Sequence, residues 1–336
     1  MKPKVLVTRR IPEAGLEILE RSCELEVRDS RLPPSKEELT SLIGDVDGLI
    51  CLLTDRIDGD VIAAGEELRV ISSYSAGVDH IDVDAATKAG IYVTNTPDVL
   101  TDATADHAWA LLMAAARRIV EADKYVRSGR WREGWDPLLL LGAPIWGKTI
   151  GFIGFGRIGV AAARRAKGFQ MRILYYSRRR IPIDLERELS AEYRPLEDLL
   201  READFVSLHV PLTPETRHLI NRERLRLMKP TAILINTSRG GVVDQEDLVE
   251  ALREGWIAAA GLDVFEDEPV KPGDPLLSLE NVVLTPHVGS ATREARTRMA
   301  VMAAENLLSV LRGVEPRHLV NPEVKDVRPL EEVKLL

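Results

Sequence analysis

The sequence predicts an α/β protein built from two doubly wound parallel sheets, and three observations lead to that prediction. Short apolar runs alternate with helix-like segments over the first hundred residues, and a second alternating pattern begins at Thr149. An alanine- and leucine-rich stretch without proline or glycine lies between the two patterns. Strands that alternate with helices form βαβ units and a mostly parallel sheet. A length of 336 residues leaves room for two domains.

The first pattern contains five expected strands and two expected helices. A helix over 13–21 follows Pro12, and another begins at Ser35, because Ser35 and Glu38 have the spacing of a capping box. The expected strands are residues 5–8, 25–27, 48–53, 70–73 and 91–94. These elements predict the first of the two parallel sheets.

The stretch between the patterns is expected to form one long helix over residues 102–128, with Thr101 as its N-cap and Gly129 as its stop. At ~1.5 Å per residue this helix would be roughly 40 Å long and would connect the two domains. Residues 131–144 follow as an irregular segment with two tryptophans and four consecutive leucines. A loop this apolar is expected to be buried against a partner subunit.

The second pattern predicts a doubly wound nucleotide-binding domain, because six strands with crossover helices match that topology. The expected strands are residues 149–155, 173–177, 205–210, 232–237, 258–264 and 282–285. The expected helices between them are residues 157–168, 196–202, 222–227 and 245–254. A last long helix is expected over 292–311, ended by Gly313.

Composition excludes several classes of protein. A net charge of -8 argues against a broad basic surface for nucleic acid or anionic lipid. Two cysteines cannot form a disulfide framework, and the histidines show no metal-binding spacing, so neither a disulfide nor a metal is expected. No apolar stretch reaches the ~20 residues of a membrane-spanning helix, and a cytoplasmic location is expected. Many charges with only six Asn and two Gln are typical of a heat-adapted protein.

A glycine-rich turn is the strongest local motif. Gly154-x-Gly156-x-x-Gly159 follows an apolar run and precedes an alanine-rich helix that begins with Arg157 and Ile158. In a dinucleotide fingerprint the first glycine makes the tight turn, the second admits the pyrophosphate and the third lets helix and strand pack closely. The pyrophosphate then lies at the positive end of the helix. The motif therefore predicts a nicotinamide dinucleotide site.

The end of the next strand bears on the choice of cofactor. An NAD site usually has Asp or Glu there to bind the ribose 2′-hydroxyl, but this sequence has Ser177 followed by Arg178, Arg179 and Arg180. Serine and arginine can bind a 2′-phosphate with charge-assisted hydrogen bonds. NADP(H) is therefore favoured, and NAD(H) stays open as the alternative, with the arginines as a solvated loop.

Three polar side chains follow the ends of the last three expected strands, namely Arg239, Glu268 and His287. Singly, each has an ordinary explanation as a salt bridge, a surface acid or a loop histidine. Together they lie where ligands collect in a doubly wound sheet. An arginine can hold a carboxylate bidentately, a histidine can donate a proton, and a glutamate can stabilise the imidazolium. The set predicts reduction of a 2-keto acid with a nicotinamide.

With these motifs in place, the chain resembles the D-isomer-specific 2-hydroxyacid dehydrogenases, and within them the glyoxylate/hydroxypyruvate reductases of the archaeal type. The likeness runs from Lys4 to about Val324. The matching segments are residues 75–82, 95–97, 154–159, 209–213, 236–240, 261–269 and 285–287. Several motifs in the right order make this resemblance specific.

The resemblance implies a fold and a set of roles. It implies a Rossmann NAD(P)-binding domain over residues 98–288, inserted into a flavodoxin-like substrate-binding domain over 1–97 and 289–336, and a homodimer. Arg239, Glu268 and His287 fall on the family's catalytic positions. The implied cofactor contacts, besides Arg239, His287 and the residues of the two motifs above, are Thr104, Val210, Pro211, Thr237, Ser238, Asp263 and Gly289. The implied substrate contacts are Leu53, Ala76, Gly77, Arg239 and His287.

The leading interpretation is a reductase of glyoxylate, and of hydroxypyruvate, to the hydroxy acid. A 3-phosphoglycerate dehydrogenase or another D-2-hydroxyacid dehydrogenase is the alternative enzyme, although the few residues after the last helix are too short for a regulatory domain. A dinucleotide-sensing corepressor is the alternative outside the enzymes, and the absence of a long tail argues against it.

Overall fold

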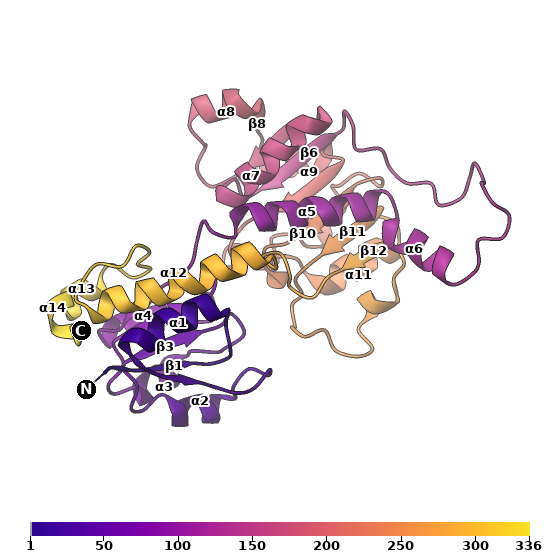
Figure 1. Ribbon diagram of the computed structural model, residues 1–336. Helices are drawn as coiled ribbons and strands as arrows, with labels where there is room; N and C mark the ends of the chain where they lie inside the picture. The colour runs from indigo at the N-terminus through magenta and orange to yellow at the C-terminus, as the bar shows by residue number, and fades with distance from the viewer. Residues whose placement is uncertain (1) are drawn as a thin grey trace. The chain divides into compact units, whose positions relative to one another are not determined.

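The computed structural model describes residues 2–336, and the chain divides into two compact units (Figure 1). Unit 1 comprises Met1–Leu100 and Ala291–Leu336, and unit 2 comprises Thr101–Ser290. The chain passes between the units after residues 100 and 290, slightly later than the expected boundaries after residues 97 and 288.

Unit 1 is built on a five-stranded parallel sheet in the order β2-β1-β3-β4-β5. The strands are β1 (Lys4–Val7), β2 (Glu24–Val27), β3 (Gly48–Cys51), β4 (Val70–Ser73) and β5 (Tyr92–Thr94). The strand order reverses between β1 and β3, which is the flavodoxin-like doubly wound topology. Every residue of β3, β4 and β5 is buried, as expected for parallel strands with helices on both faces of their sheet.

The helices of unit 1 include both predicted N-terminal helices and the predicted last helix. They are α1 (Glu13–Ser22), α2 (Lys36–Leu42), α3 (Gly59–Ala64), α4 (Val83–Lys88), α12 (Arg293–Leu311), α13 (Val324–Val327) and α14 (Leu330–Val333). The Ser35 hydroxyl accepts a hydrogen bond of 3.2 Å from the Glu38 amide and caps α2. The sequence pattern does not predict α3, α4, α13 and α14, since helices this short show no periodicity.

Unit 2 is built on a seven-stranded parallel sheet in the order β12-β11-β10-β9-β6-β7-β8. The strands are β6 (Thr149–Ile153), β7 (Arg172–Tyr176), β8 (Ala191–Tyr193), β9 (Phe205–Leu208), β10 (Ile233–Asn236), β11 (Ala259–Leu262) and β12 (Val282–Leu284). The order reverses between β6 and β9, which confirms the predicted doubly wound topology. The six expected strands are present. The sequence pattern missed β8, since three residues are too few to show an alternating pattern. It also missed the short helix α8 (Ile183–Leu189) that precedes β8.

The expected long helix over 102–128 is wrong, because the chain forms two helices there, α5 (Thr101–Ala116) and α6 (Ile119–Arg127). Arg118 between them has a left-handed backbone with φ 54°. The Ala143 amide donates a 2.8 Å hydrogen bond to the Ala116 carbonyl, which a continuous helix would need for itself. The returning chain therefore ends α5.

The other helices of unit 2 lie near their expected positions. They are α7 (Arg157–Ala166), α9 (Leu196–Glu202), α10 (Arg222–Leu225) and α11 (Gln245–Arg253), with 3₁₀ turns at Lys167–Phe169, Gly240–Val242 and Pro275–Ser278. In Figure 1, α5 lies along the sheet beside α7, against which it packs.

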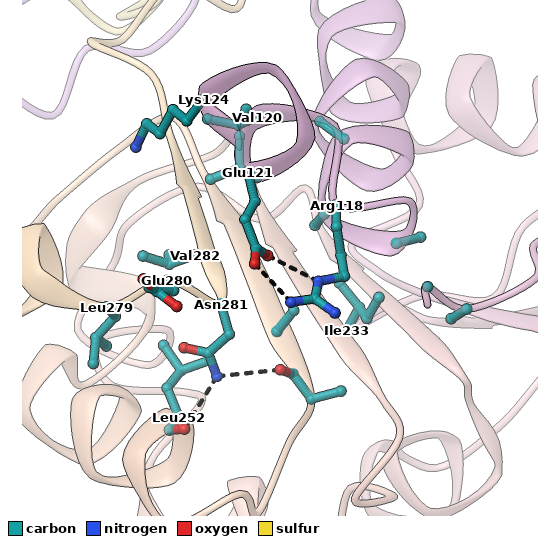
Figure 2. A pocket seen from close by; sticks show the side chains of 18 of the residues that line it. Arg118, Val120, Glu121, Lys124, Ile233, Leu252, Leu279, Glu280, Asn281 and Val282 are labelled. Atoms are coloured by element: carbon teal, nitrogen blue, oxygen red, sulfur yellow. Dashed lines mark hydrogen bonds and ion pairs between the residues drawn. The ribbon is translucent and has the colours of Figure 1, made fainter. Parts of the chain in front are cut away.

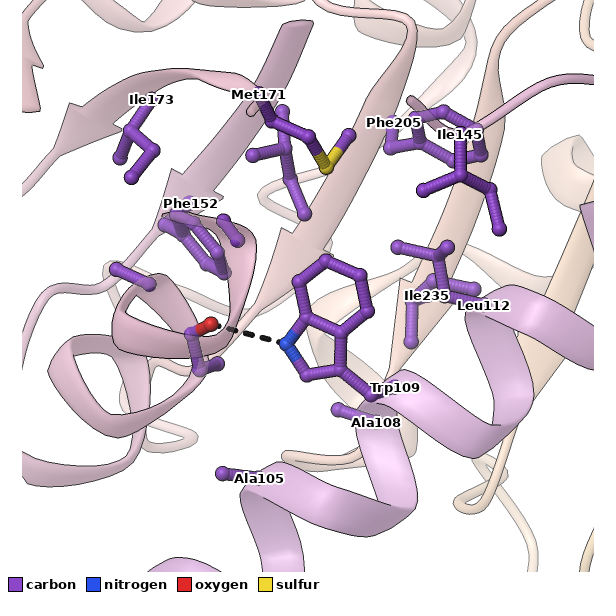
Figure 3. Close-up of a cluster of buried hydrophobic side chains, with 14 of the residues drawn as sticks. Ala105, Ala108, Trp109, Leu112, Ile145, Phe152, Met171, Ile173, Phe205 and Ile235 are labelled. Carbon is purple, nitrogen blue, oxygen red and sulfur yellow. Dashed lines mark hydrogen bonds between the residues drawn. The ribbon is translucent and has the colours of Figure 1, made fainter. Parts of the chain in front are cut away.

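A buried tryptophan fixes α5 within unit 2 (Figure 3). The Trp109 side chain is buried, and its indole N–H donates a 2.9 Å hydrogen bond to the Ala162 carbonyl of α7. Its ring stacks on Phe169 with ring centroids 4.9 Å apart. Phe152 of β6 and Ile235 of β10 belong to the same cluster. This packing sets the position of the side chains that α5 presents to the ends of the strands.

The segment after α5 exposes apolar side chains. Figure 1 shows α6 and the chain that follows it extending away from the rest of unit 2. No residue of α6 is buried, and Trp135 is 85% and Leu138 75% exposed. The expectation that this segment is buried against a partner subunit stays a prediction. Among the described residues, no helix is long and apolar enough to cross a membrane.

Candidate active site

The candidate site of unit 2 lies at the carboxyl edge of its sheet. All strand pairs in this sheet are parallel, so the carboxyl ends of β6, β9, β10, β11 and β12 meet at one edge. Gly154, Val210, Thr237, Asp263 and Thr285 each come within two residues of one of these strand ends. In doubly wound sheets ligands bind at this edge, where the strand order reverses. Here that point lies between β6 and β9.

The glycine-rich turn fits a dinucleotide. Gly154 has φ 90°, and a Cβ there would lie 2.5 Å from the His209 carbonyl oxygen. A Cβ at Gly156 would meet nothing within 4 Å, whereas one at Gly159 would lie 2.4 Å from the Gly154 carbonyl oxygen. Thus the turn is tight at Gly154, open at Gly156 and closely packed at Gly159, as the fingerprint requires.

Helix α7 begins directly after this turn with Arg157, Ile158 and Gly159. Its N-cap, Gly156, has no side chain that could accept hydrogen bonds from the first-turn amides. Such amides, with the positive end of the helix dipole, favour a phosphate ligand. These residues therefore fit the pyrophosphate of the predicted cofactor.

His209 lies next to the turn, since its carbonyl oxygen would be 2.5 Å from a Cβ at Gly154. Its ring lies 2.9 Å from the Ser207 hydroxyl and packs on Phe152 with centroids 5.9 Å apart. Desolvation lowers the pKa of His209 to about 4, so the ring is neutral at pH 7. A neutral ring with a defined partner is consistent with a structural residue.

The loop after β7 divides the predicted arginines into two groups. The Ser177 hydroxyl donates a 2.5 Å hydrogen bond to the Arg179 carbonyl, and the side chains of Arg178 and Arg179 are exposed. Arg180 instead donates two hydrogen bonds, of 2.6 and 2.9 Å, to the buried Glu186 carboxylate. The structure therefore brings Ser177, Arg178 and Arg179 to the strand end and directs Arg180 towards α8.

Glu186 is a site-shaping residue that the sequence does not reveal. Its carboxylate also accepts a hydrogen bond from the Tyr175 hydroxyl. The Arg180 guanidinium, followed by the Tyr175 hydroxyl, holds the pKa of Glu186 below its usual value. A buried carboxylate is therefore the anchor for the turn between β7 and α8.

His287 and Glu268 form a hydrogen-bonded pair. His287 Nδ1 lies 2.7 Å from Glu268 Oε2, and each side chain is about a quarter exposed. The Phe265 amide donates a 3.1 Å hydrogen bond to the other Glu268 oxygen and so orients this carboxylate. The backbone of His287 is left-handed, with φ 53°. The pairing that the predicted chemistry requires is present in the structure.

Arg239 follows β10 on a turn that Asn236 stabilises. Asn236 Nδ2 donates a 2.9 Å hydrogen bond to the Arg239 carbonyl, and its Oδ1 accepts from the Ser238 amide at 3.0 Å. A Cβ added at Gly240 would lie 1.8 Å from the Phe265 carbonyl carbon. The turn that carries Arg239 therefore packs directly against the loop that leads to Glu268, and no larger residue fits at Gly240.

Asp263 holds the loop before Gly289 with three hydrogen bonds and a close contact to His107. Its carboxylate accepts from the Thr285 hydroxyl at 2.6 Å, the Val288 amide at 2.8 Å and the Gly289 amide at 2.7 Å, and His107 Nε2 lies 3.2 Å from its Oδ1. Burial opposes its ionisation, but the hydrogen bonds from His107, Thr285 and Val288 outweigh burial and lower the pKa of Asp263.

Thr104 lies beside this network, since a Cβ at Gly289 would be 3.5 Å from the Thr104 methyl carbon. The structure therefore brings together Thr104, Asp263 and Gly289, three of the implied cofactor contacts. His107, a further residue of α5 in this network, was not singled out by the sequence.

The implied substrate contacts of unit 1 follow β3 and β4. Leu53 comes two residues after β3, and Ala76 and Gly77 lie in the loop after β4. The Ser75 hydroxyl donates a 2.6 Å hydrogen bond to the Gly77 carbonyl, and Asn95 Nδ2 donates one of 2.7 Å to the Ala76 carbonyl. Side chains thus hold this loop by its carbonyl groups.

A cavity of about 740 Å³ lies elsewhere in unit 2 (Figure 2). Its wall includes Ile233 and Val282, the first residues of β10 and β12, so it opens at the amino edge of the sheet. Arg118 pairs with Glu121 beside it. It contains none of the predicted site residues, and the described residues include no group that could hold a metal ion.

Comparison with known proteins agrees with this geometry. Residues 109–289 match the model of the D-isomer specific 2-hydroxyacid dehydrogenase NAD binding domain. A glyoxylate reductase of Korarchaeum cryptofilum is 60% identical over 329 residues, which cover 98% of this chain and 99% of that protein.

Two solved structures are also similar over nearly the whole chain. A protein of Thermus thermophilus is 52% identical with a TM-score of 0.88, covering 94% of this chain and 99% of that one. An NADPH-dependent glyoxylate/hydroxypyruvate reductase of Sinorhizobium meliloti, in complex with NADP and malonate, is 35% identical with a TM-score of 0.85, covering 96% and 98%. The chain therefore belongs to the D-isomer-specific 2-hydroxyacid dehydrogenase family.

Proposed function

We propose that the protein is a glyoxylate reductase that also reduces hydroxypyruvate. The observation that carries this proposal is the His287–Glu268 pair, 2.7 Å apart, on the same sheet edge as Arg239 and the dinucleotide turn. A relative 60% identical over its full length is named glyoxylate reductase, and the S. meliloti neighbour is named as a reductase of both keto acids.

The bound nicotinamide would supply the hydride that reduces the carbonyl carbon. Arg239 would hold the substrate carboxylate and polarise the carbonyl. Because His287 Nδ1 is bonded to Glu268, the other ring nitrogen, Nε2, would face the carbonyl oxygen and donate the proton. Glu268 would stabilise the imidazolium before this transfer and orient the neutral ring after it. The products are the 2-hydroxy acid and the oxidised cofactor.

We assign substrate binding to unit 1 and cofactor binding to unit 2. The amides of Ala76 and Gly77 would bind the substrate carboxylate, and Leu53 would contact the small end of the substrate. The hydrogen bonds that hold the carbonyls of this loop support the first assignment. A cytoplasmic location is also proposed, and the two buried cysteines, neither in a disulfide, support it.

Two alternatives are less well supported. A 3-phosphoglycerate dehydrogenase would need a basic pocket for a phosphate, and the implied substrate contacts of unit 1 include no basic side chain. A corepressor would not need an imidazole–carboxylate pair, whereas His287 and Glu268 are held in hydrogen-bond contact. The paired acid and base therefore favour an enzyme.

We propose that NADP(H) is the preferred cofactor and that Ser177, Arg178 and Arg179 contact its 2′-phosphate. Arg180 would act indirectly, because its guanidinium is bonded to Glu186 and shapes the loop. The S. meliloti neighbour is named as NADPH-dependent and was solved with NADP.

We also propose a homodimer formed through residues 126–146, the apolar arm. The large apolar side chains of the arm that are more than half exposed are Val126, Trp131, Trp135, Leu138, Leu141 and Trp146. Several large apolar side chains exposed in one segment are typical of a protein–protein contact. A second copy of the chain would bury these exposed side chains.

A panel of glyoxylate, hydroxypyruvate and pyruvate with NADH and NADPH tests the function. Turnover of glyoxylate at ~1 s⁻¹ or more is expected, in the usual range of enzymes. His287→Asn should lower kcat by roughly 10²–10⁴-fold, the typical contribution of general acid catalysis. The Kd of the cofactor, measured by fluorescence, should stay nearly unchanged. An inactive parent protein with all three keto acids would refute the function.

The pH dependence tests Glu268. Removing its charge in Glu268→Gln destabilises the imidazolium, so the pH above which kcat falls should move to lower values. Glu266→Gln is the matched control, since Glu266 pairs with His218 instead. We expect its profile to match that of the parent. An unmoved profile in Glu268→Gln would contradict the role given to this carboxylate.

The ratio of kcat/KM for the two cofactors tests the arginine loop. A preference for NADPH of roughly 10-fold, or ~1.4 kcal/mol, is expected, and it should shrink at high salt. The double variant Ser177→Asp, Arg178→Ala should reverse this preference. The new aspartate would accept a hydrogen bond from the ribose 2′-hydroxyl, and the loss of Arg178 would remove a donor to the 2′-phosphate. Arg187→Ala, an exposed arginine on α8, should leave the ratio unchanged. A strong preference of the parent for NADH would disprove the cofactor assignment.

The mass in solution tests the apolar arm. The parent should sediment as a dimer, and the double variant Trp135→Asp, Leu138→Asp should sediment as a monomer, because two buried charges would oppose the interface. Ile183→Asp, at an apolar residue 52% exposed outside the arm, should stay dimeric. A monomeric parent, or a dimeric double variant, would count against the arm as the interface.

A further inference from the structure

The Asp263 carboxylate joins three segments of unit 2 that are distant in sequence. His107 comes from α5, Thr285 follows β12, and the Val288 and Gly289 amides follow His287. We refer to the side chains of His107, Asp263 and Thr285, with the Val288 and Gly289 amides, as the Asp263 clasp.

The direction of each hydrogen bond in the clasp can be deduced. An ionised carboxylate only accepts, so the single proton of the Thr285 hydroxyl points to Asp263 Oδ1 at 2.6 Å. His107 Nε2 lies 2.9 Å from the same hydroxyl oxygen and 3.2 Å from Asp263 Oδ1. Neither oxygen has a proton left to donate to the ring. His107 therefore carries a proton on Nε2 and is the donor.

The clasp holds the residues that precede and follow His287 in the chain. Thr285 is tied to Asp263 by its hydroxyl, and Val288 and Gly289 by their amides. The His287 amide itself donates a 2.9 Å hydrogen bond to the Asp263 carbonyl. His287 has φ 53°, a left-handed backbone that a non-glycine residue keeps only when its surroundings impose it. The clasp supplies that constraint.

We propose that His107 is a positioning residue for the proton donor: through Asp263 and Thr285 it holds the loop that keeps His287 against Glu268. His107 lies on α5, which the hydrogen bond of Trp109 fixes against α7. The N–H of His107 is therefore held by a rigid helix. The proposal rests on the function proposed above, because His107 acts only through His287. Its own effect is on the geometry of the loop and needs no contact with the substrate.

The substitution His107→Leu removes the donor and leaves an apolar side chain of similar length. The expected kcat is lower by roughly 10–100-fold, since a misplacement of about 1 Å can cost 10²-fold. The KM for glyoxylate should change much less, because His107 holds no substrate group. The pH above which kcat falls should move to lower values, as in Glu268→Gln but by less. His107→Gln keeps an N–H near the Nε2 position and should recover most of the lost kcat.

Asp106→Ala is the matched control, because it removes the neighbouring side chain of α5, which pairs with Arg165 and not with the clasp. It should leave the kcat and the pH profile of the parent unchanged. Thr285→Val is the second probe, should His107→Leu fail to fold, and it should reproduce the same loss of kcat and the same shift. A parental kcat and pH profile in the variants that fold would overturn the proposal, and so would an equal loss in His107→Gln and His107→Leu.

Hydrogen exchange separates this proposal from the function on which it rests. The Val288 and Gly289 amides should exchange faster in His107→Leu than in the parent or in Asp106→Ala, and this measurement needs no substrate. An inactive parent would reject the function alone, and faster exchange would still support the clasp. Unchanged exchange in an active enzyme would reject the clasp alone.

Discussion

The ionised carboxylate of Asp263, buried within unit 2, is the constraint on which the candidate site depends. A buried charge is costly unless donors surround it, and here the donors come from α5, from Thr285 and from the backbone beyond His287. These segments cannot move independently without leaving the charge unsatisfied. The position of His287, the proposed proton donor, is thus tied to the interior of unit 2 and not to the surface loop alone.

Asn236 at the end of β10 and Glu186 in α8 apply the same principle at two other places in unit 2. Asn236 binds the backbone of the turn that carries Arg239, and Glu186 binds Tyr175 and Arg180 in the loop after β7. Each is buried and lies below an exposed or half-buried residue of the candidate site. A buried polar group with all its partners fixes loop geometry more firmly than apolar packing does, because hydrogen bonds are directional.

The parallel topology brings these turns together. Because every strand of the seven-stranded sheet runs in the same direction, the residues that follow each strand collect at one edge. The reversal of strand order between β6 and β9 separates the helices on the two faces and leaves room for a ligand there. The apolar arm, in contrast, is anchored to unit 2 at its end, where Ile145 is buried in the core, while its tryptophans are more than half exposed. Burial of these exposed side chains against a second copy of the chain stays a prediction.

Much of the fold and the location of the candidate site could be predicted from the sequence itself. The strands, the glycine turn, Arg239, Glu268 and His287 could be predicted because each is encoded within a few neighbouring residues. Local periodicity and turn chemistry do not need knowledge of distant contacts.

Tertiary structure alone decided the rest. The break after α5 arises because the Ala143 amide bonds to the Ala116 carbonyl, and Arg180 turns away from the cofactor loop because Glu186 is buried beneath it. His107 gained a place in the site only through Asp263, which lies far along the chain. Contacts of this kind depend on which segments the sheets bring together. Local sequence patterns carry no information about that proximity.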